Sequence, residues 1–331
     1  MTHEHAERLH TTARAMVAAP RGILAADESP GTMSQRLEKV GVEPTETARR
    51  DYREMLLTTP GLSESISGVI LADETFNQEL SDGRDVPKAC VDAGVLAGIK
   101  VDTGAKPLAM TPGETITEGL DGLRDRLTDY AARGAAFAKW RAALALDAQL
   151  PTERAVAVGA HALARYAALC QEAGIVPIVE PELLMDGDHG IERCEEATIA
   201  VLDTVFAALL EQGVDLAGIV LKPNMVVAGA KCAAQPSVAE VVAANLRVLL
   251  AHVPEAVPGI AFLSGGQAPE TATEHLAAIA AESTPWRISF SFGRALVDPA
   301  LQAWAGNPDR WEAGQAALDA RVRANAAVLS A

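Results

Sequence analysis

The stretch IVLKPN (219–224) ends an apolar run in a lysine, and a proline follows at once. Most strand-end lysines carry their ammonium group out to water on a flexible stem. Lys222 has another use if the run is a buried strand, because burial and neighbouring cations favour a neutral amine. A neutral amine adds to a ketone to form a Schiff base, which serves as an electron sink. The hexapeptide alone favours the solvated lysine, so the neighbouring residues decide.

Lysine is scarce in this chain, which contains seven lysines and 21 arginines. Arginine therefore supplies most of the surface charge, and the remaining lysines are candidates for roles that a guanidinium group does not fill. Lys100, Lys139 and Lys222 lie inside or at the end of apolar runs. This distribution favours a chemical role for Lys222.

Polar side chains stand at or near the C-terminal ends of seven of eight apolar runs. Such ends meet around one mouth when parallel strands close into a barrel, and the active sites of barrels lie there. Because side chains alternate along a strand, Lys139 and Arg141 share one face. Glu180 and Glu182 share a face for the same reason, and either carboxylate could shuttle protons. Structural ion pairing is the alternative for these residues: Asp27, Lys100, Lys139, Arg141, Glu180, Glu182, Lys222, Ser264 and Arg294.

Three turns offer donors for phosphate groups. FLSGGQ (262–267) and SFGRA (291–295) follow the last two runs, where barrels commonly bind phosphate through backbone amides and a helix start. DESPGT (27–32) adds a hydroxyl-rich turn near Lys100. Two anion sites flanking an amine predict a ligand with a phosphate at each end. The candidates at the last two runs are Ser264, Gly265, Gly266, Gly293 and Arg294.

The apolar runs recur at the spacing of one strand, one helix and one return. Near-continuous apolar strands alternating with helices predict a parallel sheet covered on its outer face. We therefore predict an α/β fold over residues 1–331, a single (β/α)8 TIM barrel with an N-terminal helix and extra C-terminal helices. The predicted strands are 22–27, 66–73, 96–102, 135–141, 175–181, 217–224, 259–266 and 287–294. The clearest predicted helices are 45–57, 117–132, 152–173, 192–212 and 237–252.

One residue conflicts with this pattern, because Pro177 lies inside the fifth strand and has no N–H for the ladder. A bulge or a later start of the strand would each resolve the conflict.

The composition limits the partners and the location of the protein. A formal net charge of −16 argues against a nucleic-acid or anionic-membrane partner. The four cysteines form no CxxC pair and no metal-ligand spacing, as is typical of reduced thiols. The chain has neither the apolar stretch of a secretory signal nor that of a membrane span. We expect a cytoplasmic protein.

The chain also resembles a known family, the class I fructose-bisphosphate aldolases, from about residue 5 to about residue 328. The resemblance implies a barrel lyase that reversibly cleaves fructose 1,6-bisphosphate to dihydroxyacetone phosphate and glyceraldehyde 3-phosphate, in glycolysis and gluconeogenesis. It further implies a homo-oligomer, usually a tetramer, and neither a cofactor nor a metal ion. The motifs that carry it are GILAADES, GIKVD, FAKWR, IVPIVEPE, LKPNM, FLSGGQ and SFGRAL.

The resemblance implies a role for each candidate. Lys222 would form the Schiff base, with Glu180 as the main proton shuttle and Glu182 assisting. Lys139 would stabilise the carbinolamine, and Asp27 would act on the C4 hydroxyl. The 1-phosphate would bind at Ser264, Gly265, Gly293 and Arg294; the 6-phosphate would bind at Ser29, Thr32 and Lys100, with Arg36 and Arg141 nearby.

Some positions depart from the animal members of that family. Those members end in a tyrosine that helps to protonate the enamine, whereas the tyrosines of this chain are Tyr52, Tyr130 and Tyr166. Gln35 and Phe292 replace a lysine and a tyrosine. We therefore expect the enamine proton to come from the mouth, through Glu180 or a water that it holds.

Three other readings compete. Another Schiff-base barrel lyase would not need two phosphate sites. A non-catalytic sugar-phosphate-binding scaffold would not need Lys222, Glu180 and Lys139 together. A metal-dependent aldolase would need clustered ligands, but the histidines are scattered and only His189 follows a strand.

Overall fold

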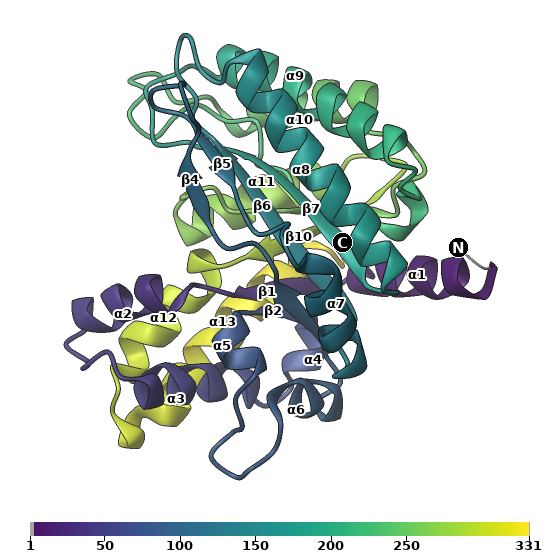
Figure 1. Ribbon diagram of the computed structural model, residues 1–331. Helices are drawn as coiled ribbons and strands as arrows, with labels where there is room; N and C mark the ends of the chain where they lie inside the picture. Colours follow the sequence, from purple (N-terminus) through teal and green to yellow (C-terminus); the bar gives the residue numbers. More distant parts are fainter. Residues whose placement is uncertain (1–2, 331) are drawn as a thin grey trace.

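A computed structural model of the chain describes residues 3–330, and its centre is a closed barrel of parallel strands (Figure 1). Around the barrel the strands follow the order β1-β10-β9-β8-β7-β6-β3-β2. This confirms the predicted TIM barrel. The strands are β1 (Gly22–Ala26), β2 (Ile66–Leu71), β3 (Leu96–Lys100), β6 (Phe137–Leu144), β7 (Val176–Leu183), β8 (Val220–Leu221), β9 (Gly259–Phe262) and β10 (Arg287–Phe292).

Helices surround the barrel, and four of the five clearest predicted ones lie within two residues of their expected bounds. Ser237 and Glu240 form a capping box at the start of α10. Within residues 3–330, none of the helices combines the length and apolarity that crossing a bilayer requires. The helices are α1 (His3–Met16), α2 (Pro30–Lys39), α3 (Glu46–Leu57), α4 (Leu62–Ser65), α5 (Asp73–Phe76), α6 (Val86–Asp92), α7 (Leu123–Ala132), α8 (Glu153–Glu172), α9 (Ile191–Glu211), α10 (Val238–His252), α11 (Pro269–Ala280), α12 (Arg294–Trp304) and α13 (Trp311–Val328).

The predicted helix 117–132 is wrong at its start, because α7 begins only at Leu123. Residues 115–117 form strand β5 (Thr115–Thr117), which pairs with β4 (Ala105–Pro107) in a small antiparallel sheet beside the barrel (Figure 1). Gly119 and Gly122 then adopt φ of 126° and 66°, which a right-handed helix does not accept. The loop after β3 therefore carries a hairpin of its own.

Strand β7 runs through Pro177 without a bulge, so both explanations offered for this proline are wrong. The N–H of Val176 donates to Ala136 O, directly before β6, and the N–H of Leu184 donates to Leu144 O on β6, so the even-numbered positions between them face that strand. The odd-numbered positions face β8, which has only two residues and pairs with Ile178 and Val179. Pro177 faces β8 at a position that β8 does not reach, so its missing N–H costs the sheet no hydrogen bond.

The apolar core has two parts, one outside the barrel and one inside. The outer part fills the space between strands and helices. In the inner part, α1 packs Leu9 and Met16 against strand residues that include Phe137 and Val220, so this helix covers the N-terminal end of the barrel. The barrel interior is therefore a packed core up to the level at which the charged residues begin.

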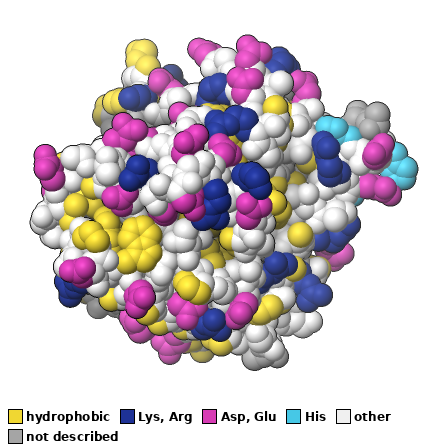
Figure 2. Space-filling model, turned by 90° about the horizontal axis from the view of Figure 1, so that it is seen from below, with side chains coloured by type: hydrophobic (Ala, Val, Ile, Leu, Met, Phe, Trp, Pro, Cys, Tyr) yellow, Lys and Arg dark blue, Asp and Glu magenta, His cyan; other side chains and the backbone are white. Residues whose placement is uncertain are grey.

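The surface combines charges of both signs. Figure 2 shows acidic and basic side chains interspersed across one face of the molecule, with apolar side chains in smaller groups. Although the chain has a net charge of −16, the acidic side chains on this face do not form a single block.

Phe137 fills the inside of the barrel because two neighbouring strands have glycine at the facing positions. A Cβ at Gly68 would lie 2.7 Å from the Phe137 ring, and a Cβ at Gly98 would overlap that ring more severely. We predict that Gly98→Ala lowers the free energy of unfolding by about 1–3 kcal/mol, the usual cost of overpacking a core. Chemical denaturation measures this change.

The matched control is Gly31→Ala, since a Cβ there would meet nothing within 4 Å and the change should stay within about 0.5 kcal/mol. Phe137→Leu in the Gly98→Ala background removes the clash, so the two substitutions should cost less together than their separate effects add up to. Strict additivity would contradict this account of the packing.

Candidate active site

A cavity of 530 Å³ opens at the C-terminal ends of the strands. Its walls carry six cationic and five carboxylate side chains, so an acidic protein has a cation-rich mouth. Of the residues proposed from the sequence, Gly266 does not line the cavity. The others do: Asp27, Ser29, Thr32, Arg36, Lys100, Lys139, Arg141, Glu180, Glu182, Lys222, Ser264, Gly265, Gly293 and Arg294.

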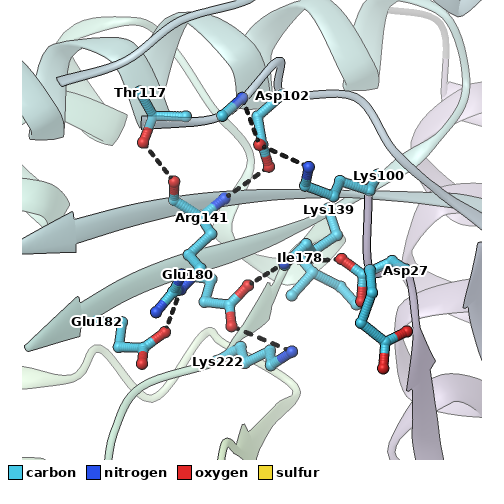
Figure 3. Close-up of polar contacts among 12 residues, drawn as sticks. Asp27, Lys100, Asp102, Thr117, Lys139, Arg141, Ile178, Glu180, Glu182 and Lys222 are labelled. Carbon is cyan, nitrogen blue, oxygen red and sulfur yellow. Dashed lines mark hydrogen bonds and ion pairs between the residues drawn. The ribbon is translucent and has the colours of Figure 1, made fainter. Parts of the chain in front are cut away.

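Four of these side chains form one continuous chain of ion pairs (Figure 3). Lys139 Nζ lies 3.0 Å from Asp27 Oδ2 and 3.0 Å from Glu180 Oε2. Lys222 Nζ lies 3.1 Å from the other oxygen of Glu180. Lys139, Glu180 and Lys222 are each at most 4% exposed. Two carboxylates and two ammonium groups therefore balance one another in a buried site, as burial requires.

Strand geometry places these groups. Side chains alternate along a strand, so Lys139 stands above the interior residue Phe137, and Glu180 stands above Ile178. Lys222 directly follows β8, and its backbone N–H donates to Val179 O at 2.8 Å. The charged layer therefore lies directly on the apolar interior of the barrel, which excludes water from below.

The ion pairs fix the charge of three groups. Burial opposes ionisation of Asp27, yet attraction to Lys139 and Lys222 outweighs it and lowers the pKa of Asp27 to about 2. Burial also opposes ionisation of Glu180, and the same two lysines bring its pKa below the usual value. For Lys139, burial favours the neutral amine, but Asp27 and Glu180 raise its pKa above the usual range. At neutral pH both carboxylates are ionised and Lys139 is a fixed cation.

A second set of contacts lies toward solvent. Arg141 Nε donates to Glu182. Lys100 Nζ lies 3.1 Å from Asp102 Oδ1, and the backbone N–H of Arg141 donates to Asp102 Oδ2 at 3.3 Å. Thr117 Oγ1, on the hairpin strand β5, donates to Arg141 O at 2.7 Å.

Sequence reasoning missed Asp102, Glu28 and Ser291, which also line the cavity. Asp102 had a readable signal, because it stands two positions after Lys100 and strand alternation would put both on one side. Glu28 had no such signal, since its partners Arg36 and Arg53 come from α2 and α3.

Two groups of turns line the cavity, and they differ in structure. After β9 and β10, Gly265 and Gly266 adopt φ of 57° and 80°, and Gly293 precedes the first turn of α12. Within the described part of the chain, Arg294 is the cation of this cavity that has no carboxylate in ion-pair contact.

The other group is formed by the first turn of α2. Ser29 caps this helix by accepting from the Thr32 N–H at 3.3 Å, and the two hydroxyl oxygens lie 3.0 Å apart. Lys100 lines the same cavity and remains paired with Asp102. Both groups therefore offer hydroxyl or backbone donors near a cation.

None of the three tyrosines lines the cavity. Tyr52 donates to Val297 O at 3.3 Å and Tyr166 donates to Ile178 O at 3.2 Å, so both hydroxyls are occupied elsewhere. Tyr130 donates to Asp73. Phe292 is buried in the outer core rather than in the cavity. Glu180 is the carboxylate in ion-pair contact with Lys222.

His189 lies outside the cavity and is buried, although its loop position is more often typical of a solvated side chain. Burial lowers its pKa. Among residues 3–330, no group of three or more His, Cys, Asp or Glu side chains is placed to hold a metal ion.

The chain is similar to known proteins over most of its length. The family model of class I fructose-bisphosphate aldolase matches residues 8–330. A probable class 1 fructose-bisphosphate aldolase of Xanthomonas campestris pv. campestris is 53% identical over 300 residues, which are 90% of each chain. Fructose-bisphosphate aldolase B of Bos taurus is 46% identical over 98% of this chain and 90% of its own.

A solved structure is similar over almost its full length. Fructose-bisphosphate aldolase of Plasmodium falciparum, in complex with TRAP and a small-molecule inhibitor, has a TM-score of 0.97 and 42% sequence identity. The match covers 99% of this chain and 96% of that one. The chain belongs to the class I fructose-bisphosphate aldolases.

Proposed function

We propose that Lys222 is the Schiff-base residue of a class I aldolase that reversibly cleaves fructose 1,6-bisphosphate to dihydroxyacetone phosphate and glyceraldehyde 3-phosphate. One observation carries the proposal: a buried lysine amine lies 3.1 Å from a buried carboxylate at the mouth of the barrel. Lys139 has two carboxylate partners whereas Lys222 has one, so the Lys222 ammonium is held less strongly. Lys222 is therefore the better placed of the two to lose a proton and attack.

The reaction begins when the Lys222 amine adds to the C2 carbonyl and gives a carbinolamine. Glu180 accepts the ammonium proton and returns a proton to the departing hydroxyl, which leaves as water. Lys139 remains charged between Asp27 and Glu180, where it stabilises negative charge that develops on substrate oxygens. Glu182, held by Arg141, borders the same space and assists in positioning.

Cleavage follows from the iminium ion. The electron pair of the C3–C4 bond moves into the iminium and forms an enamine, while the C4 hydroxyl gives its proton to Asp27 and becomes the aldehyde. The proton that Asp27 takes up reaches Glu180 through Lys139, whose Nζ lies 3.0 Å from both carboxylates. The enamine then gains a proton at C3 from Glu180 or a water that it holds. Hydrolysis of the resulting iminium releases dihydroxyacetone phosphate and restores Lys222.

The two ends of the cavity take the two phosphates. Arg294, which has no ion-pair partner among residues 3–330, suits the 1-phosphate, together with the amides at the start of α12 and the Ser264-Gly265 turn. Gly266 contributes through the backbone of the turn, since its φ of 80° favours glycine. Ser29, Thr32 and Lys100 suit the 6-phosphate, with Arg36 and Arg141 alongside.

We further propose that residues 1–331 act as a single barrel domain in the cytoplasm, assembled as a homotetramer. The barrel strands span residues 22–292, and the similar animal proteins support assignment to the same glycolytic step. Neither the scaffold reading nor another Schiff-base lyase gains support from the comparisons.

The activity test is an assay of fructose 1,6-bisphosphate cleavage with and without EDTA. Class I aldolases act without a metal ion, so we predict cleavage that EDTA leaves unchanged. Cleavage that EDTA abolishes would overturn the Schiff-base assignment.

Glu180→Gln keeps the size of the side chain but cannot accept the Lys222 proton, and we predict a loss of kcat of about 100-fold or more in the same assay.

The two phosphate sites can be separated with two substrates. We predict that Arg294→Ala weakens fructose 1,6-bisphosphate and fructose 1-phosphate alike, since both carry the 1-phosphate. Lys100→Ala should impair mainly the bisphosphate, by roughly 1.5–3 kcal/mol in kcat/KM, the size of a charge-assisted contact. Steady-state kinetics on both esters measure the split, and equal damage from Lys100→Ala would refute the placement of the 6-phosphate.

A further inference from the structure

Arg36 on α2 is held by carboxylates from two distant parts of the chain. Its Nη1 donates to Glu28 in the loop after β1, and its Nη2 donates to Asp298 on α12. Glu28 also accepts from Arg53 Nη2 at 2.7 Å. Both terminal nitrogens of Arg36 therefore have a carboxylate partner before any ligand arrives.

Two of the three arginines that line the cavity, Arg36 and Arg294, thus differ in charge balance. Arg294 has no carboxylate in ion-pair contact within the described residues, whereas Arg36 has two. Asp298 stands four positions after Arg294 on α12, so both lie on one face of that helix, next to α2 (Figure 1). Asp298 of α12 thereby shares with Glu28 the neutralisation of Arg36.

The other cations near Ser29 and Thr32 are balanced as well, because Lys100 pairs with Asp102 and Arg141 pairs with Glu182. A phosphate that binds there must therefore compete with four carboxylates for these cations. A phosphate at the start of α12 instead finds Arg294 without a carboxylate partner among residues 3–330. The attraction for a 6-phosphate is consequently weaker than the number of cations suggests.

We propose that Asp298 is a specificity-determining residue, which acts through Arg36 to limit the preference for a bisphosphate over a ketose 1-phosphate. The inference rests on the proposed function, because it requires the 6-phosphate to bind near Ser29, Thr32 and Lys100. Asp298 accepts from one guanidinium nitrogen of Arg36 and supplies one negative charge beside it. Its removal frees that nitrogen and leaves more of the positive charge of Arg36 for the ligand.

Asp298→Ala is a suitable test variant. The Asp298 side chain is 42% exposed, and Arg36 keeps Glu28 as its partner, so the substitution leaves no buried charge uncompensated. Asp319→Ala is the matched control, since it removes the same charge from a surface pair with Arg323 on α13. Circular dichroism confirms that each variant is folded.

Asp298→Ala should raise the ratio of kcat/KM for fructose 1,6-bisphosphate to that for fructose 1-phosphate by about fivefold to tenfold, mostly through KM. Cleavage of fructose 1-phosphate should change by less than about twofold, because that substrate has no 6-phosphate. Asp298→Asn should give a smaller rise, since its amide oxygen still accepts from Nη2. The gain should shrink in high salt.

Two further measurements make the test decisive. Arg36→Gln combined with Asp298→Ala should abolish the gain, because the gain needs the released guanidinium. Calorimetric titration with hexitol 1,6-bisphosphate and hexitol 1-phosphate gives the same ratio as dissociation constants, without cleavage. A wild-type chain that binds these ligands but cleaves neither ester would refute the proposed function, while the binding ratio would still decide the role of Asp298.

An unchanged ratio in Asp298→Ala would overturn the inference. So would a gain that persists without Arg36, or an equal gain in Asp319→Ala, since each would show that the effect does not pass through the Arg36–Asp298 contact.

Discussion

One buried carboxylate, Glu180, contacts two buried ammonium groups at once, and the rest of the site depends on this arrangement. Leaving either lysine without a counterion inside the barrel would cost about 3–5 kcal/mol. The second carboxylate, Asp27, lies on Lys139 and not on Lys222, which makes the two lysines unequal. One is clamped as a permanent cation, and the other shares a single carboxylate that can take its proton. The division of labour between two chemically identical side chains follows from this difference.

The barrel supplies the dry, fixed frame that this arrangement requires. Phe137 and its apolar neighbours fill the interior beneath the charged layer, and α1 covers the N-terminal end. The same frame brings the phosphate-binding turns after β9 and β10 to one rim with the first turn of α2. A bisphosphate that spans these turns would hold its carbonyl and its scissile bond over the lysines, so binding at the two ends would serve the chemistry in the middle.

Much of this could be predicted from the sequence, because strand alternation and the rule for barrel mouths are local. They placed Lys139, Glu180 and Lys222 together, and they would have placed Asp102 too. Partners far apart in the chain were not predictable: Arg36 and Asp298 are separated by 262 positions, and nothing local links them. The start of α7 was wrong because residues 115–117 pair across a hairpin. Pro177 was misread because only the register shows that it faces the two-residue strand β8.

The central claim is that Lys222, not Lys139, is the amine that attacks. Reduction with borohydride in the presence of dihydroxyacetone phosphate traps the adduct, and peptide mass spectrometry locates it. Trypsin does not cut between Lys222 and Pro223, so residues 194–231 form one peptide with a single internal lysine. We predict that this peptide gains the mass of the reduced triose phosphate as activity is lost, and that cleavage after Lys139 is unaffected. A label on Lys139, or inactivation that leaves the 194–231 peptide unmodified, would contradict the account.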